Sequence, residues 1–182
     1  GYIVLGAFAM NEIGTRGAIV QMVCHGISVT GLFIVVDIVE RRTGTRDVKK
    51  LGGLWKLSPR LGSLALVFAL ATLGLPGLGN FVGEFLILAG AYQNHPICAA
   101  IAAVGAVLAT AYSLRIVQQV FFGPAQEDAS VHESPAFSTA ICATLIAVLL
   151  WIGFFPQSLL DTARIVRIDR AQALMTSAGE RQ

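Results

Sequence analysis

The sequence predicts an all-α protein, a polytopic bundle of transmembrane helices with one broken helix. Of its 182 residues, 55% are hydrophobic and only 13% are charged, and the mean hydropathy is +0.70. Soluble domains usually carry about 25% charged residues. The chain also contains several apolar runs long enough to cross a bilayer, one of them interrupted by glycine and proline. The formal net charge of +2 argues for no particular partner, and the small number of charges argues against nucleic-acid binding, which needs a basic face.

Two elements open the chain. Residues 1–10 are apolar, but a helix of this length rises only about 15 Å, half of a bilayer core. We therefore expect a truncated span here, and a chain that is the C-terminal part of a longer protein. Asn11–Gly14 is interpreted as a turn, and the run 17–40 as the first full span.

The next element, 60–92, is too long for one straight membrane helix. Its 33 residues would extend about 50 Å, well beyond the bilayer. The segment Gly74–Asn80 near its middle explains the excess, because Pro76 removes a backbone donor and the glycines permit non-helical angles. We predict two half-helices joined by an unwound stretch at membrane depth, which is tolerated only where it is buried in protein or lines a cavity.

Two more spans follow, at 97–122 and 136–155, each bounded by proline or glycine. Residues 1–161 are therefore predicted to form one transmembrane domain. The remaining 162–182 form a polar tail, and a short surface helix is expected near Leu159–Met175.

The loops indicate the orientation in the membrane. The loop 41–60 contains seven lysines and arginines against Asp47 alone, so the positive-inside rule places it in the cytoplasm. With that orientation the tail lies outside, although Arg164, Arg167 and Arg170 within it argue against this.

Glu84 is the leading candidate for chemistry, because a carboxylate in an apolar broken helix is costly and proton relays are a main use of such residues. It lies about 12 Å before the outer end of its helix at Tyr92, and His25 lies about 12 Å from the outer end of its own at Gly17. The two side chains therefore share a level, and such a pair can exchange a proton near neutral pH. Simpler roles stay open: His25 bonding a backbone carbonyl, and Glu84 bonding free amides at the helix break.

Three other polar residues are candidates of lower rank. Arg115 lies in the inner half of its span, where it either snorkels to the interface or pairs with a carboxylate or with carbonyls freed at the break. Tyr112, one turn earlier, suits packing better than a relay. Asp37 borders the basic loop and is predicted to pair with Arg41.

No cofactor site is indicated within the chain. Cys24, Cys98 and Cys142 stand alone in apolar runs, which argues against a metal or iron–sulfur site. No nucleotide-binding or hydrolase motif is present in a suitable context.

Several stretches of the chain closely resemble the antiporter-like membrane subunits of respiratory complex I, above all the subunit M family of bacterial NADH–quinone oxidoreductase. The resemblance covers roughly residues 1–161 and is most specific around Glu84. The stretches that carry it are Gln21–Ser28, Gly52–Trp55, Leu73–Phe85, Tyr112–Arg115, Phe121–Gly123 and Phe155–Asp161.

The resemblance implies positions for the two main candidates. Glu84 falls on the family's ionisable residue of the broken helix, which connects the proton path to the outer side, and His25 on the histidine of its central polar axis. Related L and N subunits and large antiporter subunits typically carry Lys where Glu84 stands. Asp37 departs from the family pattern, which has a small residue there, and the family's earlier half is absent from this sequence.

The resemblance also implies a function. It indicates a proton-translocating subunit of the bacterial inner (plasma) membrane that couples electron transfer from NADH to quinone to proton pumping. NADH, FMN, iron–sulfur clusters and quinone would belong to partner subunits, and the neighbours would be other membrane subunits, especially antiporter-like ones, and lipid. Two alternatives stay open, a subunit of a multisubunit cation/proton antiporter and a purely structural assembly subunit.

Overall fold

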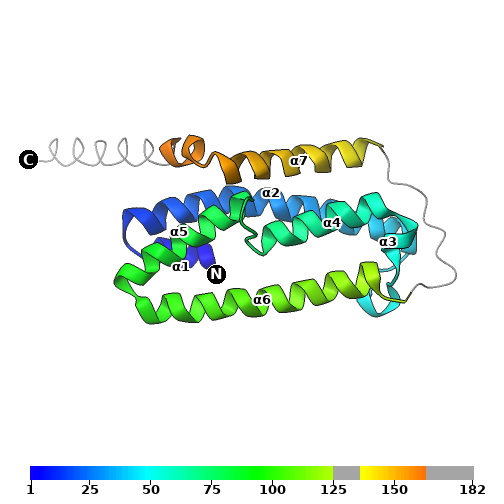
Figure 1. Ribbon diagram of the computed structural model, residues 1–182, viewed down its shortest axis with the longest axis horizontal. Helices are drawn as coiled ribbons and strands as arrows, with labels where there is room; N and C mark the ends of the chain where they lie inside the picture. The colour runs from blue at the N-terminus through cyan, green and yellow to red at the C-terminus, as the bar shows by residue number, and fades with distance from the viewer. Residues whose placement is uncertain (125–135, 163–182) are drawn as a thin grey trace, which may run out of the picture.

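The computed structural model of the protein describes residues 1–124 and 136–162, and this part of the chain is helical throughout apart from turns and connections (Figure 1). The all-α prediction is therefore confirmed. Within the described ranges, three helices are long and apolar enough to cross a membrane, at Glu12–Thr43, Pro96–Phe122 and Phe137–Phe154. The elements are α1 Tyr2–Phe8, α2 Glu12–Thr43, η1 Val48–Lys50, α3 Leu54–Leu57, α4 Pro59–Thr72, α5 Gly79–Asn94, α6 Pro96–Phe122 and α7 Ala136–Phe154. Residues 157–162 are helical as well.

Helix α2 begins earlier than the sequence suggested. The predicted turn at Asn11–Gly14 is wrong, because only Asn11 lies outside the helix. Its side-chain oxygen accepts a hydrogen bond of 2.8 Å from the Gly14 amide, which satisfies one of the free donors of the first turn. At the other end Gly44 closes the helix with φ +70°, a left-handed conformation that favours glycine.

The long apolar run is interrupted between α4 and α5. Helix α4 ends at Thr72 and α5 begins at Gly79. With 14 and 16 residues, the two helices are about 21 and 24 Å long, and each is shorter than a bilayer core. Gly74 and Gly77 adopt φ of +65° and +97°. The segment between the helices is folded on itself, since the Leu75 amide donates to the Leu70 carbonyl oxygen at 3.1 Å.

Helix α2 is the central element, packed against α1, α4, α5 and α7 (Figure 1). Its contact with α5 is unusually close because glycines face each other. A Cβ atom on Gly17 would lie 2.7 Å from the Ile87 amide nitrogen and 3.0 Å from the Gly83 carbonyl oxygen, and one on Gly90 would collide with the backbone of Gly14. Small residues of this kind let helix backbones approach in membranes, where packing replaces the hydrophobic effect.

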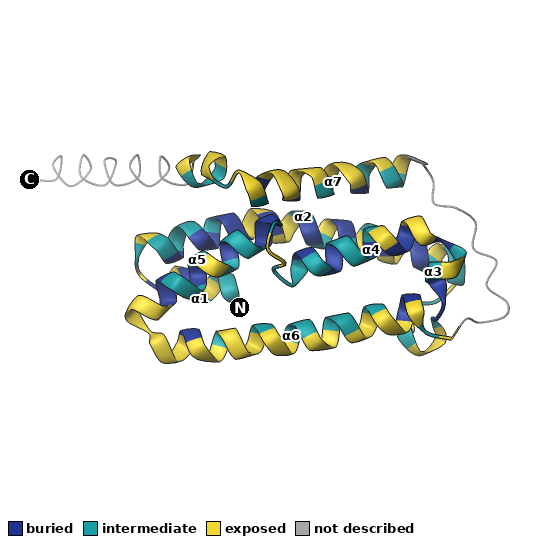
Figure 2. Ribbon diagram, in the orientation of Figure 1, coloured by how far each residue is buried: buried dark blue, intermediate teal, exposed yellow. Residues whose placement is uncertain are grey.

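Helices α6 and α7 form the outside of the bundle, and most of their surface is exposed (Figure 2). The Tyr2 hydroxyl donates to the Ala102 carbonyl oxygen at 3.0 Å, which joins α6 to α1. At its other end α6 is held by the stacking of Phe122 on Trp55, with ring centroids 4.9 Å apart. The exposed side chains of both helices are largely apolar, which suits lipid or another membrane helix.

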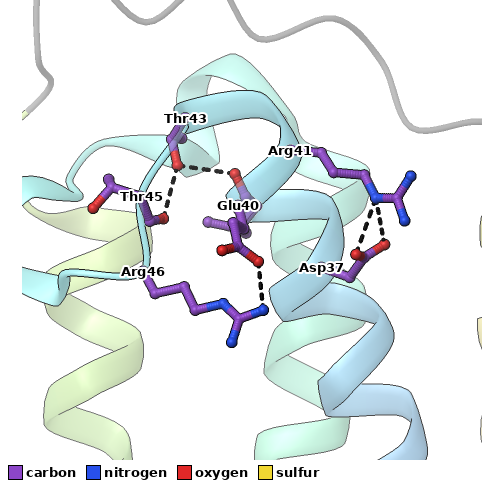
Figure 3. Close-up of polar contacts among 7 residues, drawn as sticks. Asp37, Glu40, Arg41, Thr43, Thr45 and Arg46 are labelled. Carbon is purple, nitrogen blue, oxygen red and sulfur yellow. Dashed lines mark hydrogen bonds and ion pairs between the residues drawn. The ribbon is translucent and has the colours of Figure 1, made fainter.

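The basic loop is more ordered than a simple connection, since it contains η1 and α3. The predicted pair of Asp37 and Arg41 is confirmed: the Arg41 Nε donates to Asp37 Oδ1 at 2.9 Å and lies 2.8 Å from Oδ2 (Figure 3). A second ion pair of 2.6 Å joins Arg46 to Glu40. Exposed pairs of this kind stabilise a protein by only about 0–1 kcal/mol. The arginines of the tail lie outside the described residues, so the predicted orientation stays a prediction.

The glycine contact between α2 and α5 gives a direct test of the packing. We expect Gly17→Ala to lower the free energy of unfolding by about 1–3 kcal/mol, because the added methyl group meets backbone atoms that cannot move aside. The measurement is thermal unfolding of the complete protein in detergent. Gly105→Ala is the matched control, since a Cβ there has no atom within 4 Å and alanine favours the helix. An equal loss of unfolding free energy in both variants would contradict the close approach of α2 to α5.

Candidate functional site

Glu84 and His25 line one cavity of about 180 Å³. Helices α1, α2, α5 and α6 contribute to its wall, together with the end of α4 where the chain breaks. The lining residues are Gly1, Tyr2, Ile3, Gln21, His25, Thr72, Leu73, Glu84, Ala106 and Ala109. Sequence counting placed Glu84 and His25 at one level, and the structure places both on this shared wall.

The Glu84 carboxylate is held between α2 and the helix break. One oxygen, Oε1, accepts a hydrogen bond of 3.3 Å from the Gln21 side-chain nitrogen. The other, Oε2, faces Gly74, where a Cβ atom would collide with it. Glu84 accepts no hydrogen bond from a backbone amide within residues 1–124 and 136–162, so the role of satisfying free amides at the break is not what this geometry provides.

His25 lies one turn after Gln21 on α2, and its side chain is exposed. Its ring makes no hydrogen bond within the described part of the chain, whereas its backbone carbonyl accepts one of 3.1 Å from the Ser28 hydroxyl. The alternative of a ring bonded to a carbonyl between packed helices is therefore absent here. His25 and Glu84 both line the cavity, and no hydrogen bond joins their side chains.

Gln21 was missed by the sequence argument. It is only 4% exposed, on an apolar helix, and its side chain is the only hydrogen-bond partner of Glu84 in the described residues. The signal was available, because Gln21 and His25 are four residues apart and therefore lie on the same face of a helix. Gln21 is neutral and carries a much smaller burial penalty than a charge, so it did not stand out.

A second buried polar pair continues the same line. The Asn80 side-chain nitrogen donates to the Ser28 hydroxyl at 3.2 Å, and both residues are fully buried. Asn80 lies one turn before Glu84 on α5, just as Ser28 lies beyond His25 on α2. We refer to Gln21, His25, Ser28, Asn80 and Glu84 as the polar seam. Its members come from α2 and α5, and two hydrogen bonds, from Gln21 to Glu84 and from Asn80 to Ser28, join the two helices through it.

Tyr112 and Arg115 do not reach this site. Both are exposed on α6, and neither is among the residues that line the cavity. Arg115 has no polar partner within residues 1–124 and 136–162. The structure therefore brings together Glu84 and His25, and leaves the other two candidates outside.

The chemistry of the site is that of a carboxyl group and an imidazole around a small polar space. Across the described ranges no three His, Cys, Asp or Glu side chains lie close enough together to hold a metal ion. The volume of about 180 Å³ is enough for several waters, each of which takes about 30 Å³ in the liquid. Such an arrangement can accept, hold and pass on protons.

Comparison with known proteins gives a consistent family. Residues 1–110 match the family described as "NADH:quinone oxidoreductase/Mrp antiporter, TM". Curated relatives are NADH-quinone oxidoreductase subunit M of Pseudomonas aeruginosa, 41% identical over 161 residues, and that of Escherichia coli K12, 39% identical over 166 residues. These alignments cover 88% and 90% of this chain but 32% and 33% of the relatives, so the chain spans about a third of their length.

Solved structures agree. A chain of respiratory complex I from Thermus thermophilus with bound NADH is 32% identical, with a TM-score of 0.81 over 89% of this chain and 35% of that one. A chain of the Mrp complex from Dietzia is 23% identical, with a TM-score of 0.75 over 89% of this chain and 39% of that one. At that identity the second likeness supports the fold alone.

The contact of Gly74 with Glu84 is testable by a pair of substitutions. Gly74→Ala and Gly77→Ala both place a side chain at positive φ, which costs roughly 1–2 kcal/mol, but only the first pushes against the Glu84 carboxylate. We expect Gly74→Ala alone to change the rate at which a hydrophobic carbodiimide labels Glu84, measured by peptide mass spectrometry. The same change in labelling rate in both variants would mean that the backbone of the helix break, and not the contact of Gly74 with Glu84, sets the position of the carboxylate.

Proposed function

The chain belongs to the NADH:quinone oxidoreductase/Mrp antiporter transmembrane family, and on this basis we propose that it is part of a proton-translocating membrane subunit of NADH–quinone oxidoreductase. Its part in the reaction is to move protons across the membrane while electrons pass from NADH to quinone elsewhere in the complex. The observation that carries the proposal is the position of Glu84, a carboxyl group at the helix break that lines a cavity together with His25.

Glu84 is assigned the central step. An ionised carboxyl group in a membrane interior is costly. Whether it holds or releases a proton therefore depends strongly on the polarity of its surroundings. A break in the helix supplies polar backbone beside it, which is tolerated at membrane depth only in such protected places. Glu84 accepts a proton from the cavity and releases it toward the outer side.

His25 is assigned the lateral step. An imidazole can both accept and donate a proton, and the His25 ring is free of hydrogen bonds to the described residues. Because it shares the cavity with Glu84 but does not contact it, the proton crosses by way of water. Tyr112 and Arg115 have no part in this path, since they do not line the cavity.

The redox chemistry is assigned to partners. We place NADH, FMN, the iron–sulfur clusters and quinone in other subunits, and the complex in a bacterial inner membrane, as the bacterial relatives suggest. Neighbouring antiporter-like subunits and lipid would cover the apolar faces of α6 and α7. A cation/proton antiporter subunit is the runner-up. Relatives at 39–41% identity are named as oxidoreductase subunits, whereas the likeness to the Mrp complex is at 23%.

Glu84→Gln in the complete complex tests the central step. The amide keeps the shape of the side chain but cannot carry a proton, so transfer through this subunit should slow on the order of a hundredfold. The measurement is proton translocation per NADH oxidised in membrane vesicles, with assembly checked on native gels.

Asp37→Asn is the matched control, since it removes an exposed carboxylate paired with Arg41 on the same side of the molecule as the basic loop. Normal pumping in Glu84→Gln with intact assembly would end the proposal. A defect in assembly alone would favour the structural role, and NADH-independent sodium exchange would favour the antiporter.

His25→Ala should have a milder effect. Water can replace a relay group at a modest cost, so we expect pumping to fall by roughly fivefold. The same vesicle assay measures it, and a loss as complete as that of Glu84→Gln would show that His25 is indispensable and not a replaceable relay.

A further inference from the structure

Gln21 has a buried atom without a partner. Its side-chain nitrogen donates to Glu84, but its oxygen, Oε1, is buried and accepts no hydrogen bond from any described residue. Leaving a buried acceptor unpaired costs about 1–3 kcal/mol, and such atoms in native structures call for a reason. An apolar side chain of the same size would fill this space without that cost, so the amide itself is needed.

The space around the amide is shaped for it. A Cβ atom on Gly83 would lie 2.5 Å from the Gln21 oxygen and 2.9 Å from its Cβ atom, so this amide fits only because α5 has a glycine there. The nitrogen and oxygen of an amide are nearly equal in size and differ only in donating or accepting. A half-turn of the amide therefore exchanges donor and acceptor toward Glu84 without a change of volume.

We propose that Gln21 is the positioning residue for Glu84 in both of its protonation states. When Glu84 is ionised, the Gln21 nitrogen donates to its carboxylate, and the 3.3 Å contact from this nitrogen to Glu84 Oε1 has the geometry that this state requires. When Glu84 carries a proton, the amide turns and its oxygen accepts a hydrogen bond from the new carboxylic O–H. No covalent bond changes in Gln21, and the proton stays on Glu84 throughout.

This arrangement keeps the carboxyl group in one place while its charge changes. Glu84 remains against Gly74 and open to the cavity, where Tyr2 and His25 are the other titratable side chains that line the wall. The end of α4 contributes only Thr72 and its C-cap residue Leu73 there, and α6 contributes only alanines. Gln21 matters in this way only if Glu84 changes its protonation state, as proposed above.

The experiment is infrared difference spectroscopy on the complete complex, which reads hydrogen bonding at Glu84 in each protonation state. Spectra between acidic and alkaline conditions are recorded for the wild type, for Gln21→Met and for Glu84→Gln, the last of which assigns the Glu84 bands by their disappearance. We expect Gln21→Met to shift both the carboxylate bands and the carboxylic C=O band of Glu84, the latter to higher wavenumber. Proton translocation in the same variant should fall about fivefold, as for one lost hydrogen bond.

Gln118→Met is the matched control, because Gln118 is exposed on α6 and lies outside the cavity. A shift of the carboxylate bands alone would overturn the amide rotation and leave Gln21 as a donor to the ionised form only. Unshifted bands in Gln21→Met would reduce Gln21 to packing. These readouts do not depend on pumping by Glu84, so normal pumping in Glu84→Gln would refute the proposed function while the spectra still decide the hydrogen bond.

Discussion

The close contact of α2 with α5 is the constraint on which the rest of the structure depends. Gly14 and Gly17 on α2 meet Gly83 and Gly90 on α5, and a methyl group at any of these positions would meet atoms closer than 3 Å. Because nothing separates the two backbones, short polar side chains can span the gap. Gln21 reaches Glu84 and Ser28 reaches Asn80 only at this spacing.

The helix break takes its position from the same contact. Helix α5 lies along α2 from its first turn, so the chain must leave the direction of α4 before Gly79, and Gly74 and Gly77 supply the left-handed angles for that change. Gly74 then lies against the Glu84 carboxylate. The residue that allows the chain to bend is thus also the residue that makes room for the Glu84 side chain, which ties the backbone of the break to the candidate site.

Much of this fold could be predicted from the sequence because apolar runs and glycine–proline clusters act locally. The break near Gly74–Asn80 could be predicted because the apolar run around it is too long for a bilayer. The common level of Glu84 and His25 could be predicted by counting residues from the ends of two antiparallel helices. The start of α2 was not predictable in this way, because Asn11 is equally compatible with a turn and with a helix cap. Gln21 escaped notice because a neutral amide carries little burial penalty. Tyr112 and Arg115 could not be placed, since the facing of a helix depends on its neighbours.

The wall that α6 gives to the cavity has a consequence for water. This helix contributes Ala106 and Ala109, whose methyl groups offer water no hydrogen bond, whereas the polar lining comes from the other helices, with Tyr2, Gln21, His25, Thr72 and Glu84. Any water that enters the cavity therefore finds its side-chain hydrogen-bond partners on α1, α2, α5 and the end of α4, and none in the two alanine side chains of α6. A chain of water through this cavity would depend on the placement of those polar side chains as well as on the width of the space.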